Sequence, residues 1–163
     1  MKTAVVYYSL TGNSAYLAKK AAELTGGCLI RLLPENDIPK KGFGRFIKGG
    51  SAAIRKMPVK LIPYEFDESN YDSVIICFPV WASNCPPAIG AFLKDHSLKD
   101  QRVYLLSSSM SGQSDDVAEK LRGLLGDTPL IAAEGFRSPL KKPEEAEAKL
   151  ILFLRRQALM NER

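Results

Sequence analysis

The run Val74-Ile75-Ile76-Cys77-Phe78 constrains the fold of this chain more than any other stretch. Five consecutive apolar residues fit a strand that is covered on both faces, which is typical of a parallel sheet between two layers of helices. Four further β-rich runs accompany it, at residues 2–8, 28–33, 102–107 and 128–136. We therefore expect an α/β fold in which five parallel strands alternate with helices.

Helical patterns fill most of the intervals between these runs. We expect helices at residues 13–24, 87–94 and 114–125, and a last one that begins near Pro143. Residues 34–64 instead form a long connector with four prolines, in which a helix near 43–54 is the one expected element. Connectors of this length inside a compact domain often carry function. At 163 residues the chain is expected to form a single domain, residues 1–163.

The positive charge of the chain is concentrated in one segment. The chain carries a net charge of +5, and residues 40–60 contain seven Lys or Arg residues and no Asp or Glu. Subtracting those seven charges leaves −2 for the rest of the chain. The segment is either a solvated lysine-rich face or a docking surface for an acidic partner or a nucleotide phosphate. We expect no nucleic-acid binding, because basic and aromatic residues are not interleaved in a binding motif.

Composition also bounds the location of the protein. No apolar run approaches the roughly 18–20 residues of a membrane helix, and the N-terminus has no signal-peptide pattern. Cys28, Cys77 and Cys85 are odd in number and lack CxxC spacing, so we expect neither a disulfide framework nor a zinc site. A cytoplasmic protein without a membrane segment is the expectation.

The first run leads into a loop rich in hydrogen-bonding side chains, Ser9-Leu10-Thr11-Gly12-Asn13-Ser14. Three hydroxyls, an amide and the N–H groups of a helix start can hold a phosphate dianion without any Lys or Arg. Gly12 lets the backbone approach the anion closely. The alternative is a plain helix cap, since Ser, Thr and Asn are preferred there. The stretch is neither GxxxxGK[ST] nor GxGxxG, which argues against ATP hydrolysis and a standard dinucleotide fold.

Two more loops of unusual composition follow strands at the same edge of the expected sheet. The second, Pro79-Val80-Trp81-Ala82-Ser83-Asn84, holds the only tryptophan, which at the crevice rim can stack on a planar ring. The alternative is that Trp81 fills the core. The third, Ser108-Ser109-Met110-Ser111-Gly112, offers small polar groups for the edge of such a ring. Ligands of open α/β sheets bind at this edge, so we expect the three loops to converge.

Together the three loops resemble those of the flavodoxin-like family, whose members bind flavin mononucleotide (FMN), over nearly the whole chain. Residues 9–14 match that family's phosphate loop, [ST]-x-T-G-x-[ST], at every fixed position. The resemblance implies a three-layer sandwich with strand order 2-1-3-4-5, in the short-chain form. It also implies that residues 9–14, 79–84 and 108–112 bind FMN.

Two departures bear on function. Met110 stands where carrier flavodoxins usually place an aromatic residue, and the chain is basic where they are strongly acidic. An acidic protein surface disfavours the anionic reduced flavin and so lowers its reduction potential. A basic surface should weaken this effect, so the very low reduction potential of such carriers is not expected here.

Other candidate residues receive a structural interpretation. Cys28 and Cys77 lie in apolar strands and are expected in the core, and His96 is expected at the surface end of a helix. Cys85 is a candidate redox-sensitive thiol, although no basic neighbour in the sequence lowers its pKa. No Asp ends the first strand, which argues against a response-regulator receiver.

Three functions remain open. The first is an FMN electron carrier between redox partner proteins, for which the basic segment at residues 40–60 would be a docking surface if the partners are acidic. The second is an NAD(P)H-dependent reductase of quinones or free flavin, and the third is a flavin-free interaction module. No catalytic side chain is assigned, because the flavin would carry the redox chemistry. We favour the carrier.

Overall fold

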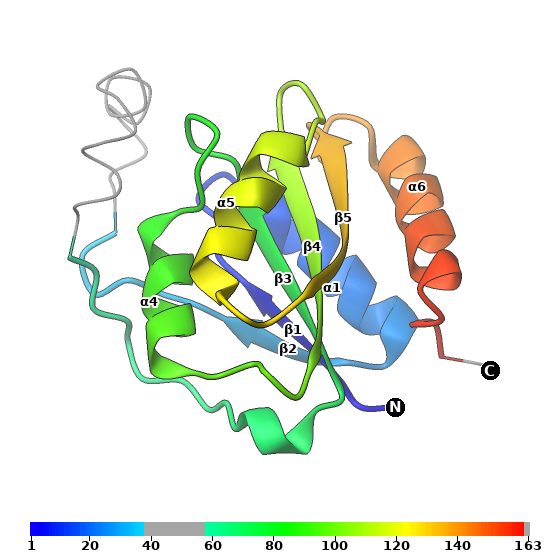
Figure 1. Cartoon of the computed structure of the whole chain (residues 1–163). Coiled ribbons are helices and arrows are strands. Elements are labelled where there is room, and N and C mark those ends of the chain that lie inside the picture. Colours follow the sequence, from blue (N-terminus) through cyan, green and yellow to red (C-terminus); the bar gives the residue numbers. More distant parts are fainter. Residues whose placement is uncertain (38–57, 162–163) are drawn as a thin grey trace.

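A five-stranded parallel sheet forms the centre of the computed structural model, which describes residues 1–37 and 58–161 (Figure 1). The strands are β1 (Thr3–Tyr7), β2 (Cys28–Arg31), β3 (Ser73–Pro79), β4 (Arg102–Ser109) and β5 (Leu130–Arg137). They lie in the order β2-β1-β3-β4-β5, and each neighbouring pair is parallel. This confirms the predicted α/β class and strand order.

Helices cover both faces of this sheet, giving three layers. They are α1 (Asn13–Thr25), α4 (Pro87–Asp95), α5 (Asp115–Leu125) and α6 (Pro143–Arg156), with a short 3-10 helix at Glu68–Asn70. In Figure 1, α4 and α5 lie on one face, and α1 and α6 lie on the other. The four helices were expected at these places, whereas the helix expected near 43–54 lies outside the described residues.

The apolar run that identified the fold supplies both cores. Val74, Ile76 and Phe78 of β3 join the core cluster under α4 and α5, while Ile75 and Cys77 join the one under α1 and α6. All five side chains are fully buried. Truncating either isoleucine to alanine is expected to cost about 2–5 kcal/mol of stability, because a cavity remains.

Strand ends differ from the prediction where pairing reaches beyond the apolar run. Pro79 belongs to β3, because its register partner is Ser108, and β4 continues to Ser109, because Ser109 pairs with Arg137 of β5. β2 ends earlier, at Arg31, since the next segment turns to form an antiparallel bridge between Pro34 and Leu61. The carboxyl ends of β3 and β4 thus bring the second and third loops together.

Two further expectations, on membrane-spanning helices and on the basic segment, can be followed only within the described residues. Within those residues, none of the helices combines the length and the hydropathy that a bilayer-spanning segment requires. Most of the basic segment, residues 40–56, lies outside them. Its last member, Lys60, is described, and its ammonium nitrogen lies 2.9 Å from a carboxylate oxygen of Glu35.

Candidate functional site

The first loop joins β1 to α1 and leaves the N-terminus of that helix open. Gly12 is the N-cap with φ 96°, a left-handed conformation that favours glycine, and among the residues that the structure describes no side-chain cap hydrogen bond is formed. The Ser9 hydroxyl accepts a hydrogen bond from the Gly12 N–H at 3.2 Å, while Thr11 is exposed. The first turn of α1 therefore keeps N–H groups that have no intrahelical partner and can bind an anion.

Ser14 and Ser108 tie the first loop to the third. Their hydroxyl oxygens lie 2.8 Å apart in a buried hydrogen bond, and the Cys77 thiol donates to the Ser14 carbonyl at 3.3 Å. Ser14 is therefore buried, which its place in the phosphate-loop motif did not predict. Leu10 is buried as well, so the exposed side of this loop is formed mainly by Thr11.

The second loop is a two-residue hairpin. The N–H groups of Trp81 and Asn84 each donate to the carbonyl of the other, at 3.0 and 2.9 Å. Ala82 and Ser83 at its tip have φ values of 47° and 61°, as a type I′ turn requires. Neither is a glycine, so each holds strain of about 1 kcal/mol or more, a feature that gathers at functional sites.

Trp81 lies in the core and not at the crevice rim. Its side chain is 2 % exposed and packs edge-on against Tyr8, with ring centroids 5.5 Å apart. The expectation of a rim position is therefore wrong, and the structural alternative holds. The reason is Tyr8, which ends the first run on the same side of the sheet and covers the indole. The exposed groups of this loop are Ala82 and Ser83.

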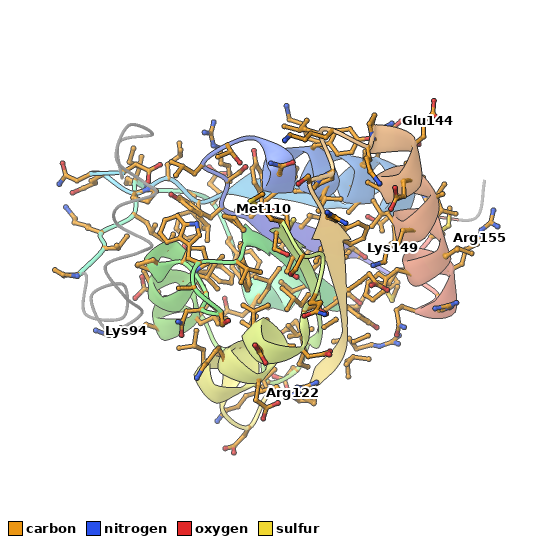
Figure 2. All side chains as sticks on the ribbon, turned by 90° about the horizontal axis from the view of Figure 1, so that it is seen from above. Lys94, Met110, Arg122, Glu144, Lys149 and Arg155 are labelled. Carbon is orange, nitrogen blue, oxygen red and sulfur yellow. The ribbon has the colours of Figure 1, made fainter. Side chains whose placement is uncertain are left out.

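The third loop begins inside β4 and lies beside the second. The Val80 N–H donates to the Ser108 carbonyl at 2.9 Å, and the Gly112 N–H donates to the Ser109 hydroxyl at 2.9 Å. Met110 is 83 % exposed, and Figure 2, which views the molecule from above relative to Figure 1, shows it near the end of β4. The predicted convergence of the three loops is confirmed by these contacts.

Three neighbours of these loops were missed by the sequence interpretation. Leu140, in the turn after β5, donates its N–H to the Asn13 side chain at 3.1 Å and occupies the space beside Gly12. The Tyr8 hydroxyl donates to Asp37 at 2.7 Å, and burial, reinforced by that carboxylate, raises the pKa of Tyr8 strongly. Only the position of Leu140, after the carboxyl end of a strand, could have signalled its role.

The cysteines and the histidine correct further expectations. Cys28 is exposed although it belongs to a strand, whereas Cys77 is buried as predicted. Burial raises the pKa of the Cys85 thiol to about 12, which argues against a redox-sensitive thiolate. His96 lies at the C-cap of α4, as expected, but is only partly exposed, with its ring nitrogens 3.0 Å from the Tyr64 hydroxyl and 3.1 Å from the Glu68 carboxylate.

Comparisons with known proteins agree with this geometry. The family model described as Flavodoxin matches residues 2–135. A candidate flavoprotein from Bacteroides eggerthii DSM 20697 has a TM-score of 0.78 at 22% identity, over 94% of this chain and 96% of that chain. A flavoprotein from Lactobacillus acidophilus NCFM, in complex with FMN, has a TM-score of 0.65 at 19% identity, over 88% and 97%.

A third structure, Fusobacterium nucleatum flavodoxin bound to flavin mononucleotide, has a TM-score of 0.56 at 10% identity, over 96% of this chain and 98% of that chain. At these identities the likeness establishes the fold. No curated protein matches the chain. Because the family model spans most of its length, this chain belongs to the flavodoxin family.

Proposed function

We propose that this protein binds FMN and carries electrons between protein partners. One observation carries the proposal: the buried Ser14–Ser108 hydrogen bond holds an uncapped helix N-terminus beside a serine-rich loop. Such a helix end suits the phosphate of a flavin nucleotide, and the loop supplies polar groups for its ring. The FMN bound by the Lactobacillus and Fusobacterium proteins supports the same ligand here.

The donor set of the first loop fits a phosphate monoester. Thr11 is exposed, Ser9 and Asn13 are partly exposed, and Gly12 leaves room for close approach of the backbone. FMN would supply the redox chemistry when bound, and the chain would hold and orient it. The exposed groups of the second and third loops are Ala82, Ser83, Met110 and Ser111.

Exposed apolar side chains around the same loops support the proposal of a protein partner. Met110 is 83 % exposed and Leu140 is 49 % exposed, and both belong to loops that meet at the candidate site. Exposed apolar side chains beside a functional site are typical of surfaces that dock other proteins. The basic residues Lys141 and Lys142 next to Leu140 favour an acidic partner, as does the basic segment at residues 40–60. We also propose a reducing compartment such as the cytoplasm, since all three cysteines are free thiols.

An anaerobic reduction experiment tests this function. The FMN-saturated protein is mixed with NADPH or NADH, alone and together with a flavodoxin reductase, and flavin absorbance is followed. We expect reduction only when the reductase is present. Rapid bleaching by NADPH or NADH alone would instead make the protein an NAD(P)H-dependent reductase. A protein that takes up no FMN would be an interaction module.

A further inference from the structure

A groove runs along the outer face of α4, away from the phosphate-binding helix end. It has a volume of about 850 Å³. α4 lines it with Pro87, Gly90, Ala91 and Lys94, which share one face at helical spacing. The opposite face of α4 is buried in the core. The groove therefore lies on the outward face of α4, outside the hydrophobic core.

The walls of the groove are largely apolar. Val59, in the segment that enters the described region at residue 58, forms one side, and Leu124 of α5 forms the other, with 48 % of its surface exposed. A Cβ atom at Gly90 would meet no atom of the described residues within 4 Å. The missing side chain at Gly90 thus leaves open space between α4 and these walls.

The charged side chains that line the groove are mostly positive. Lys60, Lys94 and Lys120 line it, against one carboxylate, Asp95. Lys60 pairs with Glu35, whereas Lys94 and Lys120 form no ion pair with any described residue. They project from two different helices, and Figure 2 shows Lys94 at the α4 side of the molecule, opposite α6. An occupant is therefore expected to carry negative charge.

We propose that this groove binds an amphiphilic organic anion: a small molecule with an apolar body and a carboxylate, sulfonate or phosphate at one end. The volume lies within the range of about 300–1,000 Å³ that small-molecule pockets share. The apolar body packs over Gly90 and Ala91 between Val59 and Leu124, and the anionic end lies between Lys94 and Lys120. The groove shares Asn84 with the second loop but takes no residue from the first loop, to which the phosphate is assigned, or from the third.

Calorimetric titration with 8-anilinonaphthalene-1-sulfonate (ANS) tests the groove on FMN-saturated protein. We expect one saturable site in the wild type and at least tenfold weaker binding in Gly90→Leu, whose side chain fills the groove. Gly123→Leu is the matched control, since a Cβ there also meets nothing and Gly123 does not line the groove. Both substitutions favour helix, so both variants should fold. Absence of saturable binding, or equal binding by the two variants, would overturn the proposal.

Charge is tested with neutralising variants. Lys94→Gln/Lys120→Gln should weaken ANS binding at least tenfold, while the control Lys19→Gln/Arg155→Gln, which removes the same charge from α1 and α6, should not. The uncharged probe N-phenyl-1-naphthylamine should bind the wild type more weakly than ANS. If both probes bind alike, the anionic assignment is wrong.

Two further readouts separate the remaining outcomes. If Gly90→Leu converts a dimer into a monomer in light scattering, the occupant is a second copy of the chain and not a small molecule. FMN uptake is measured in parallel by flavin absorbance in every variant. Loss of ANS binding with unchanged FMN uptake confirms that the groove and the proposed flavin site are separate.

Discussion

At the scale of single residues, a few side chains define the candidate site. Ser14 and Ser108 are hydrogen-bonded to each other, so they join the loops, and Thr11 is the exposed hydroxyl of the turn proposed to bind the phosphate. Trp81 belongs to the second loop, and its side chain anchors that loop in the core.

Thr11→Asp is expected to weaken FMN binding at least 100-fold. A carboxylate within about 4 Å of a phosphate costs up to about 4 kcal/mol at an effective dielectric constant of 20. Flavin-fluorescence titration measures the dissociation constant. Thr11→Ser, which keeps the hydroxyl, and Ser97→Asp, which adds the same charge beyond the C-terminus of α4, are the controls. If Thr11→Asp and Ser97→Asp bind FMN with equal affinity, the assignment of the phosphate to this loop is wrong.

The three thiols should react at very different rates with a disulfide reagent in the native protein. Cys28 is exposed, Cys77 is buried, and the pKa of the Cys85 thiol is about 12. At pH 8 a thiol with that pKa is ionised to about one part in ten thousand, and the thiolate is the reactive form. We expect one fast thiol, absent in Cys28→Ser, in a colorimetric thiol assay. A fast phase that persists in Cys28→Ser and disappears in Cys85→Ser would show a reactive Cys85.

At the scale of elements, the third loop rests directly on β5. A methyl group at Gly135 would overlap the carbonyl oxygen of Gly112 and lie 2.9 Å from a backbone carbon of Gln113. Gly112 itself has φ 77° and a backbone N–H bonded to Ser109. The loop therefore keeps its position because Gly135 carries no side chain.

Gly135→Ala should displace the third loop. We expect a loss of about 1–3 kcal/mol in the free energy of unfolding, as is usual when extra atoms enter a packed site, and about tenfold weaker FMN binding. Urea denaturation and flavin-fluorescence titration measure the two effects. Gly123→Ala, at a position with open space, serves as the control and should change neither. Unchanged FMN affinity in Gly135→Ala would mean that the loop position does not matter for the flavin.

The elements were predictable from the sequence because their patterns are local. The apolar run at Val74 identifies a strand, and Gly26, the C-cap of α1, marks a helix end, without any knowledge of neighbours. The burial of Trp81 was not predictable, because it depends on Tyr8, which follows a different strand, β1. Leu140 contacts Asn13 across 127 residues, so no local pattern announces it. Loops could be assigned to the site, but the direction of their side chains could not.

At the scale of the whole molecule, the connector that follows residue 58 is attached to α4 by an aromatic and polar cluster. His96 lies between the Tyr64 hydroxyl and the Glu68 carboxylate, and its ring packs on Phe66 and Phe92. Hydrogen bonds from its own backbone N–H and from His96 hold the pKa of Glu68 below its ordinary 4.5. This cluster lies apart from the three loops and contributes to stability.

Stability should therefore depend on Glu68 in acid. A carboxyl whose pKa is lower in the folded state stabilises the fold above its unfolded value and loses that contribution as pH falls through the folded value. We expect the melting temperature of the wild type to fall below about pH 4.5, and to fall less in Glu68→Gln. Glu65→Gln, an exposed change of the same charge in the same segment, is the control. Identical pH profiles for Glu68→Gln and the wild type would refute this role.

The comparison of FMN with riboflavin tests the central claim most directly, since the two ligands share the ring and differ by the phosphate. Purified apoprotein is titrated with each ligand, and quenching of flavin fluorescence gives the dissociation constants. Because the helix N-terminus and the hydroxyls of the first loop are assigned to the phosphate, we expect FMN to bind at least 100-fold more tightly than riboflavin. Thr11→Asp should remove most of that difference. Equal affinity for FMN and riboflavin, or no binding of either, would contradict the account.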